Sequence, residues 1–184
     1  GIKTGYNDAF LIDELKREEL ILKDPKSSEI IKPILRGKDV QRYDYVFCQK
    51  YLIDTHNGYI DENGNQILAI NIDSYPAVKE HLDQFWDKIS ERKDRGVTPY
   101  NLRSCAYYKD FSKEKVAWTP VNSEYRFAIL PSNYFFNNSR LLKRLPRENF
   151  WANTLVFTKI RCFSCRSNGA KSARNYKNTN ATRA

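Results

Sequence analysis

Between residues 1 and 139, short apolar runs alternate with polar turn signals, and one longer segment has helical periodicity. From residue 75 to residue 95, apolar residues recur at spacings of three and four, which predicts one long amphipathic helix with a stripe of Val78, Leu82, Phe85 and Ile89. A helix is also predicted over residues 14–24, with Asp13 as its N-cap and Pro25 as its stop. A shorter helix is predicted over residues 29–36, ending at Gly37.

Strand signals surround these helices. Apolar and aromatic residues predict a strand over residues 44–54 and hairpin arms over 51–55 and 66–72, punctuated by Asn57-Gly58 and Asn63-Gly64. Residues 115–121 and 125–130 read as paired strands across a polar turn, and residues 133–139 begin another. The chain is therefore expected to be α+β, with a mixed, mainly antiparallel sheet, one long amphipathic helix and short N-terminal helices.

The positive charge is concentrated at one end of the chain. The net charge is +9, but 11 of the 31 Lys and Arg residues lie in residues 140–184, against one of the 22 Asp and Glu residues. The remaining 20 basic and 21 acidic residues leave residues 1–139 close to neutral. The net charge alone therefore gives no support for nucleic-acid binding by this first part.

Length and composition limit the other options. A chain of 184 residues with 41% hydrophobic residues can bury a core and is expected to form one domain. Its apolar runs are too short to cross a bilayer, and it has no signal-peptide pattern. The missing Met at position 1 is expected of an internal piece of a larger polypeptide. Four scattered cysteines do not form a disulfide framework, so we expect a cytoplasmic protein.

Motifs for catalysis, metal binding and phosphate binding are missing from the sequence. No glycine motif for a phosphate or dinucleotide is present, and Cys162 and Cys165 form a single C-x-x-C where structural zinc needs four ligands. The segment around Asp61 lacks the glycine and glutamate of a calcium loop and is predicted to be a turn. His81 is predicted to be structural, whereas His56 is left with two alternatives, shaping a turn or contacting a ligand.

Two clusters have the residue types that contact nucleic acids. The segment LRGKDVQRYDY contains Arg36, Lys38 and Arg42, and TPYNLRSCAYY places Asn101 and Arg103 among tyrosines. Arginine and lysine bind phosphates or guanine edges, asparagine reads adenine, and aromatic rings accept unstacked bases. An ordinary exposed loop is the alternative for each cluster. For Tyr43, Tyr107 and Trp118, packing in the core or against strands is favoured over base stacking.

The order of segments adds a family resemblance. The segments GIKTGYNDAFLID, DPKSSEIIKPILRGKDVQRYDY, YLIDTHNGY, the stretch from Tyr75 to Phe111, EKVAWTPV and YFFNNS together resemble the TaqI-like C-terminal specificity domain. This is the target-recognition domain of type IIG restriction enzymes fused to adenine-specific DNA methyltransferases. The match covers residues 1–139 in order, and LRGKDVQRY and TPYNLRSC are its most specific parts.

The resemblance implies a function without a catalytic site in this segment. In such enzymes an N-terminal domain binds S-adenosylmethionine and flips an adenine from the duplex, and the specificity domain supplies most base contacts. By this resemblance, the partners are double-stranded DNA and a methyltransferase domain, in cis or from an adjacent reading frame, and S-adenosylmethionine is the cofactor of the parent enzyme. The DNA-facing candidates are Arg36, Lys38, Arg42, Tyr43, Asn101, Arg103, Asn137 and Asn138.

The segment after Ser139 departs from the family pattern. In the family a further strand and a helical segment close the domain, whereas residues 140–184 match neither. We therefore expect a target-recognition domain over 1–139 that is incomplete at its C-terminus, followed by a basic tail over 140–184 that is disordered or frame-shifted. A genuine basic arm for phosphate contacts is the alternative. Two other function classes stay open, a non-catalytic protein-interaction scaffold and a small nuclease.

Overall fold

The computed structural model describes residues 2–118, 126–137 and 140–142, and all structural statements below concern these residues. The contacts divide the chain into two units, Gly1–Arg144 and Leu145–Ala184. The predicted tail begins at the last described strand, β9 (Arg140–Leu142), and its residues 143–184 lie outside the described part. The predicted ends of the two segments therefore stay predictions.

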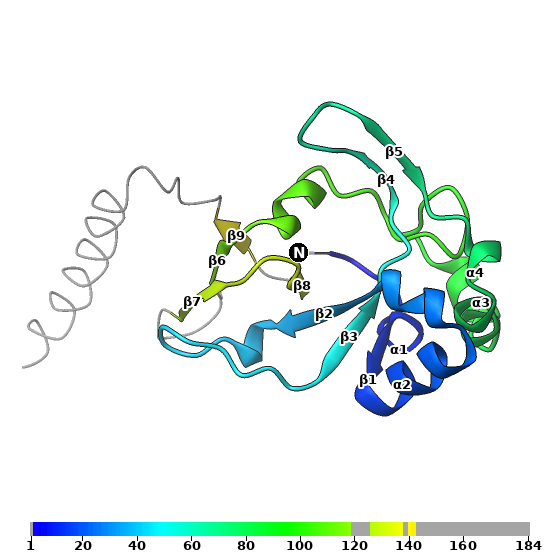
Figure 1. The fold of residues 1–184 in the computed structure, drawn as a ribbon, viewed down its shortest axis with the longest axis horizontal. Coiled ribbons are helices and arrows are strands. Elements are labelled where there is room, and N and C mark those ends of the chain that lie inside the picture. The colour runs from blue at the N-terminus through cyan, green and yellow to red at the C-terminus, as the bar shows by residue number, and fades with distance from the viewer. Residues whose placement is uncertain (1, 119–125, 138–139, 143–184) are drawn as a thin grey trace, which may run out of the picture. The chain divides into compact units, whose positions relative to one another are not determined.

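A four-stranded mixed sheet forms the centre of the first unit, in the order β1-β3-β2-β8 (Figure 1). Its strands are β1 (Leu11–Asp13), β2 (Ile31–Arg36), β3 (Lys50–Ile53) and β8 (Phe135–Asn137). β3 pairs antiparallel with β1 and β2, whereas β2 and β8 run parallel. The expected α+β class with mainly antiparallel strands is therefore confirmed.

The helix predicted over residues 29–36 is wrong, because this segment is β2, preceded by the 3-10 turn η1 (Pro25–Glu29). β2 pairs with β3 through Ile31–Pro33 and with β8 through Ile34–Arg36. Pro33, which has no N–H to donate, thus lies where the pairing changes from one neighbour to the other. Buried Ile31 and Ile34 are β-branched and favour this extended conformation.

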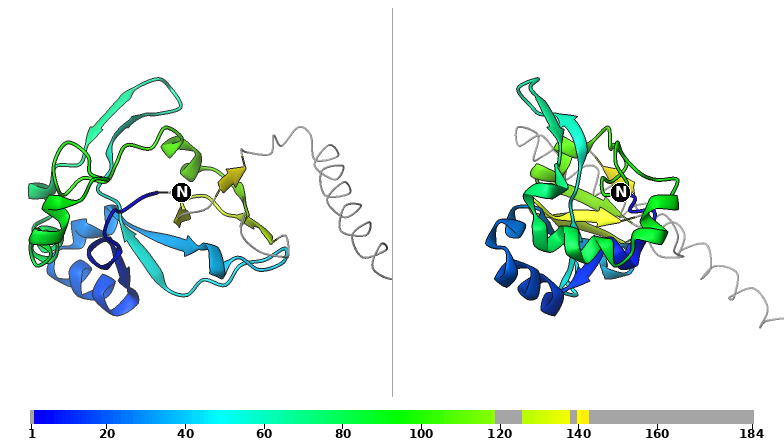
Figure 2. Two further views of the ribbon diagram at one scale, coloured as in Figure 1. Left: turned by 180° about the vertical axis from the view of Figure 1, so that it is seen from behind. Right: turned by 90° about the vertical axis from the view of Figure 1, so that its right-hand side faces the viewer.

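Two smaller sheets complete the strands. β4 (Asn57–Ile60) and β5 (Gln66–Ala69) form a hairpin that stands away from the central sheet in all three ribbon views (Figures 1 and 2). The predicted arm over residues 51–55 instead belongs mostly to β3. β6 (Lys115–Trp118) pairs antiparallel with β7 (Phe127–Leu130) and with β9. The predicted pairing of residues 115–121 with 125–130 is confirmed for the described residues.

The helices pack at one end of the central sheet. α1 (Asn7–Phe10) precedes β1, and α2 (Glu14–Lys23) follows it. The backbone N–H of Lys16 donates to Asp13 Oδ1 over 3.0 Å, which confirms the predicted N-cap. Further 3-10 turns are η2 (Gly37–Asp39), η3 (Ile72–Ser74) and η4 (Tyr108–Ser112).

The single long helix predicted after residue 75 is wrong, because the segment forms α3 (Pro76–Asp83) and α4 (Trp86–Glu91). The N–H of Phe85 bonds to the carbonyl of Leu82 over 3.0 Å, a tight i−3 bond that interrupts the α-helical ladder. The Phe85 ring packs there against Tyr6 and His81. The predicted apolar stripe nevertheless faces the core, since Val78, Leu82 and Ile89 are fully buried and Phe85 is partly buried. In the described part of the chain, no helix has the length and apolar character needed to cross a membrane.

Candidate nucleic-acid interface

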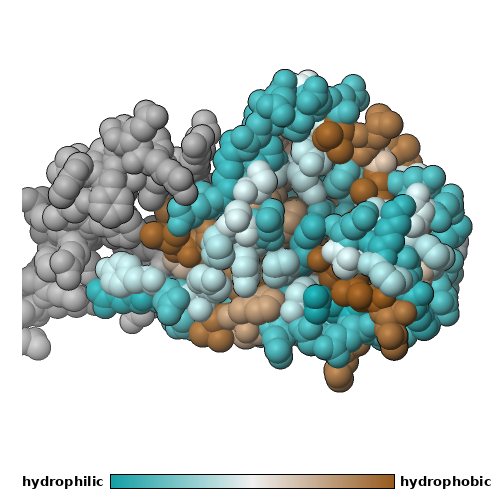
Figure 3. Space-filling view, in the orientation of Figure 1, coloured by the Kyte–Doolittle hydropathy of each residue, from teal (hydrophilic) through white to brown (hydrophobic). Residues whose placement is uncertain are grey.

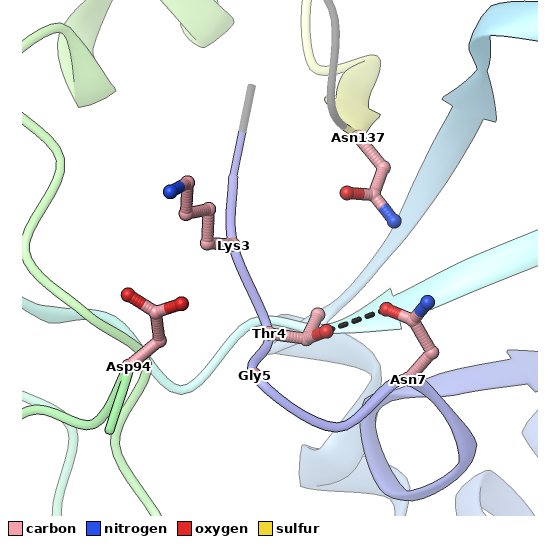
Figure 4. A pocket seen from close by; sticks show the side chains of 6 residues that line it. All are labelled: Lys3, Thr4, Gly5, Asn7, Asp94 and Asn137. Atoms are coloured by element: carbon pink, nitrogen blue, oxygen red, sulfur yellow. Dashed lines mark hydrogen bonds between the residues drawn. The ribbon is translucent and has the colours of Figure 1, made fainter. Parts of the chain in front are cut away.

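The segment from Ile2 to Gly5 lies against the end of the central sheet. The N–H of Ile2 donates to the carbonyl of Phe136 over 2.9 Å, and Ile2 bridges in parallel to Asn137 of β8. Lys3 is exposed next to this bridge. A pocket of about 280 Å³ opens here, and Figure 4 shows its lining residues Lys3, Thr4, Gly5, Asn7, Asp94 and Asn137.

Local geometry fixes the turn at the floor of this pocket. The hydroxyl of buried Thr4 donates to Asn7 Oδ1 over 2.6 Å. Gly5 has a φ of +70°, and a Cβ there would lie 3.2 Å from the Arg92 side chain and 3.3 Å from Asp94 Cβ. Both the left-handed backbone and the close approach favour glycine at this position.

Arg92 connects this segment to the loop that follows α4. Its guanidinium is buried, stacks 4.3 Å from the centre of the Phe10 ring, and donates to four backbone carbonyls, those of Thr4, Asp94, Pro99 and Asn101. Burial lowers the pKa of Arg92 to about 10, against the raising effect of Asp94, so the group is still charged at neutral pH. Arg92 therefore holds together the two segments that carry Lys3 and Arg103.

A second pocket of about 310 Å³ adjoins the first and shares Lys3 with it. Arg103 lines this pocket with a side chain that is 58% exposed, and its Nη1 lies 2.9 Å from Asp94 Oδ1. We call the two pockets together the Lys3 site, with Lys3, Thr4, Gly5, Asn7, Asp94, Arg103 and Asn137 as its principal residues. Of the sequence-predicted residues, the structure brings Arg103 and Asn137 into this site.

Arg36 and Asn137 are also neighbours, since they are register partners in β2 and β8. The Arg36 guanidinium, however, donates from Nε and Nη2 to the buried carboxylate of Asp39, each over 3.0 Å. Burial of Asp39 acts to raise its pKa, but the hydrogen bonds from Arg36 outweigh burial and lower it. The same pair raises the pKa of Arg36. Arg36 therefore supports the turn after β2, where Lys38 is exposed.

Arg42 and Tyr43 form the tip of the turn that follows η2. The N–H of Gln41 bonds to the carbonyl of Asp44 over 2.7 Å, and Tyr43 has a left-handed φ of +72°. The Arg42 guanidinium lies 5.5 Å from the centre of the Tyr43 ring. Tyr43 is 53% exposed and Tyr107 is 38% exposed, so neither lies in the core, although the Tyr107 ring packs 6.1 Å from that of buried Phe111. The side chain of Trp118 lies outside the described part.

Asn101 is not available to a ligand in this structure. It is 1% exposed, its amide donates to the carbonyl of Ile70 over 2.9 Å, and its Oδ1 accepts from the Thr98 hydroxyl over 2.6 Å. These bonds satisfy both ends of the amide and give Asn101 a structural role. Asn138 lies outside the described residues.

The two histidines and Asp61 have structural explanations. His56 Nδ1 accepts from the N–H of Gly58 over 3.2 Å, which supports the turn-shaping alternative, and His81 is buried with Nε2 3.0 Å from the carbonyl of Ala9. Burial lowers the pKa of both imidazoles. Asp61 accepts from the N–H groups of Asn63 and Asn65 in the predicted turn. Within the described ranges no cluster of three or more side chains could hold a metal, and Cys162 and Cys165 fall outside them.

Lys3 and Arg92 were missed by the sequence reasoning. Lys3 stands in a Gly- and Thr-rich loop, and its role depends on a bridge to β8 at the far end of the described chain. In the sequence, Gly5 is the residue that indicates a turn next to Lys3. The structure shows that Gly5 adopts a left-handed backbone there.

Comparisons with known proteins add no assignment, because no protein-family model and no curated protein matches the chain.

Proposed function

We propose that this chain is a sequence-specific DNA-recognition module, the specificity domain of a type IIG restriction–modification enzyme that methylates adenine. The proposal starts from the ordered resemblance of residues 1–139 to such domains. In this proposal the chain works in the cytoplasm with an N-terminal methyltransferase domain, in cis or from an adjacent reading frame. That domain would bind S-adenosylmethionine and carry the chemistry.

The observation that carries the proposal is the convergence of three separate segments. Arg36 of LRGKDVQRY stands beside Asn137 of the last matching segment in the β2–β8 pair. Asn137 and Arg103 of TPYNLRSC line adjoining pockets that share Lys3. Three of the residues chosen from the sequence for their DNA-contact chemistry, Arg36, Arg103 and Asn137, thus lie near the β8 edge of the central sheet.

The exposed cations of this edge suit the DNA backbone. Lys3 and Arg103 are exposed and can each neutralise a phosphate, although Asp94 offsets part of the charge of Arg103. Lys38 and the Arg42–Tyr43 tip are exposed on the turn after β2. Phosphate contacts of this kind position a protein, and base-edge contacts then specify the sequence.

A selection experiment tests the proposal. The full 184-residue chain is incubated with a library of duplexes that contain a random central segment, and bound duplexes are amplified and sequenced over several rounds at physiological salt. The proposal predicts that one short consensus is enriched. Equal recovery of all sequences would contradict it. Such a result would indicate binding without sequence recognition, which the basic residues of positions 140–184 can provide through phosphate contacts.

A second candidate, a protein-interaction scaffold, is favoured by exposed apolar residues on α2. Leu15 is 78% exposed and Leu22 is 88% exposed, and Figure 3 shows hydrophobic residues on the face near α2. A double variant Leu15→Glu, Leu22→Glu separates the candidates when it is combined with duplex selection. A chain that selects no consensus, and whose variant loses binding to the product of the upstream reading frame, would favour the scaffold, whereas a consensus that the variant still selects would favour DNA recognition.

A further inference from the structure

A third pocket, of about 260 Å³, shares no lining residue with the Lys3 site and lies between the β4–β5 hairpin and η4. Four aromatic rings from three separate elements line it, Tyr59 of β4, Tyr108 and Phe111 of η4, and Phe135 of β8. Phe111 and Phe135 stack at 4.6 Å with an interplanar angle of 17°, and the rings of Tyr59 and Tyr108 are 4.2 Å apart. The phenylalanines are buried, whereas the two tyrosines are partly exposed to the pocket.

The aromatic wall is held in place from behind. The Tyr108 hydroxyl donates to Asp54, a carboxyl that is 2% exposed. His56 packs edge-on against both Tyr59 and Tyr108, at 5.1 Å and 5.3 Å. The tyrosine rings are therefore positioned before any ligand arrives, which lowers the ordering cost of stacking a ligand on them.

The rim of the pocket carries charges of both signs. Hydrogen bonds in the hairpin turn lower the pKa of Asp61, so its carboxylate stays charged, and Glu62 pairs with Lys113 over 2.7 Å. Lys32 and Lys109 also line the pocket, and neither forms an ion pair with any carboxylate in the part of the chain that the structure describes. The site thus combines flat aromatic surface with two cations at its edge.

We propose that this pocket, lined by Tyr59, Tyr108, Phe111 and Phe135 with Lys32 and Lys109 at its rim, binds an unstacked nucleobase together with its phosphate. Aromatic side chains accept any base by stacking, and the lysines suit the attached phosphate. The pocket is smaller than the ~300–1,000 Å³ typical of sites for drug-sized ligands, which fits one base rather than a larger molecule. The inference does not depend on the proposed recognition of a duplex sequence, because a free nucleotide offers the same chemistry.

The test compares two fluorescein-labelled duplexes that differ by one unpaired adenine, titrated with the full chain at fixed salt. The chain should bind the duplex with the unpaired adenine about tenfold more tightly than the fully paired duplex, since stacking of one base changes affinity by ~5- to 150-fold. Tyr59→Leu should bring the ratio of the two dissociation constants close to one, and Tyr59→Phe should retain it. The basic segment after residue 140 is present in every variant and cancels from the ratio.

Because Tyr59→Leu could impair folding, a second variant changes the exposed residue Lys109. Lys109→Glu should weaken binding of the duplex with the unpaired base severalfold more than Lys88→Glu, an equal charge change at an exposed residue of α4. If adenosine monophosphate competes with the labelled duplex, a free nucleotide is a ligand of the pocket. If it does not compete and the ratio of the two dissociation constants is as expected, the ligand is a base carried by a strand. A wild-type ratio of one, or equal effects of the two lysine variants, would overturn the proposal. Neither result depends on whether a duplex consensus is selected.

Discussion

The guanidinium of Arg36 and the buried carboxylate of Asp39 form two hydrogen bonds of 3.0 Å, and the backbone N–H of Arg36 donates to the same carboxylate over 2.8 Å. Asp39 is 3% exposed and therefore largely screened from water. Arg36 forms its ion pair among the described residues. A residue chosen from the sequence for DNA contact thus has a clear structural task.

Arg36→Ala should therefore lower the free energy of unfolding by about 2–3 kcal/mol, because it leaves a buried carboxylate without its partner. Urea denaturation measures the loss. The double variant Arg36→Ala, Asp39→Asn should recover part of the stability, since the unmatched charge is gone. A single variant as stable as the wild type but defective in duplex binding would show that Arg36 acts on DNA directly.

Asn101→Ala should also act through stability. Removing the buried amide leaves the carbonyl of Ile70 without this donor, which we expect to cost about 1–3 kcal/mol. The Thr98 hydroxyl belongs to an exposed residue and can bond to water instead. Duplex binding by the folded fraction should be unchanged. The check is a urea titration followed by binding measurements well below the unfolding midpoint.

Tyr43→Gly should weaken DNA binding without lowering stability. Glycine accepts the φ of +72° without strain, so stability should be unchanged or higher by up to about 1 kcal/mol. Loss of the exposed ring and of its contact with Arg42 should weaken duplex binding severalfold. Gln49→Gly, at a φ of +48°, is the matched control and should leave binding intact. A Tyr43→Gly protein that is less stable but binds normally would assign the ring to folding.

Stability should depend on pH through Asp54. Burial raises its pKa to about 7 from an ordinary 3.8, although the Tyr108 hydroxyl acts to lower it. Between these two values the folded state holds a proton that the unfolded state has lost, so stability falls as the pH rises and levels off above about pH 7. Asp54→Asn has no such titration. The unfolding free energy of the wild type relative to this variant should drop by about 2–4 kcal/mol between pH 4 and pH 7.5, and a pH-independent difference would contradict the buried acid.

Sequence reasoning succeeded where neighbours along the chain decide the structure. The Asp13 cap of α2 depends on residues three apart, and β6 and β7 are close together in the sequence. It failed over residues 29–36, where pairing with both β3 and β8 overrides a helical pattern. The Lys3 site could not be foreseen, because it is assembled by the bridge from Ile2 to Asn137 and by the carbonyl bonds of Arg92. Residue type favoured Arg103 and Asn101 equally as DNA contacts. Only their burial in the structure shows that Arg103 is accessible and Asn101 is not.

The role of the Lys3 site in DNA binding is tested most directly by removing its two exposed cations together. Lys3→Gln with Arg103→Gln should weaken duplex binding, and the slope of log affinity against log salt should fall by about 2, roughly one for each lost phosphate contact. The control Arg17→Gln with Lys88→Gln removes the same charges from α2 and α4 and should leave the slope unchanged. Equal slopes for the wild type and both double variants would contradict DNA binding at this site.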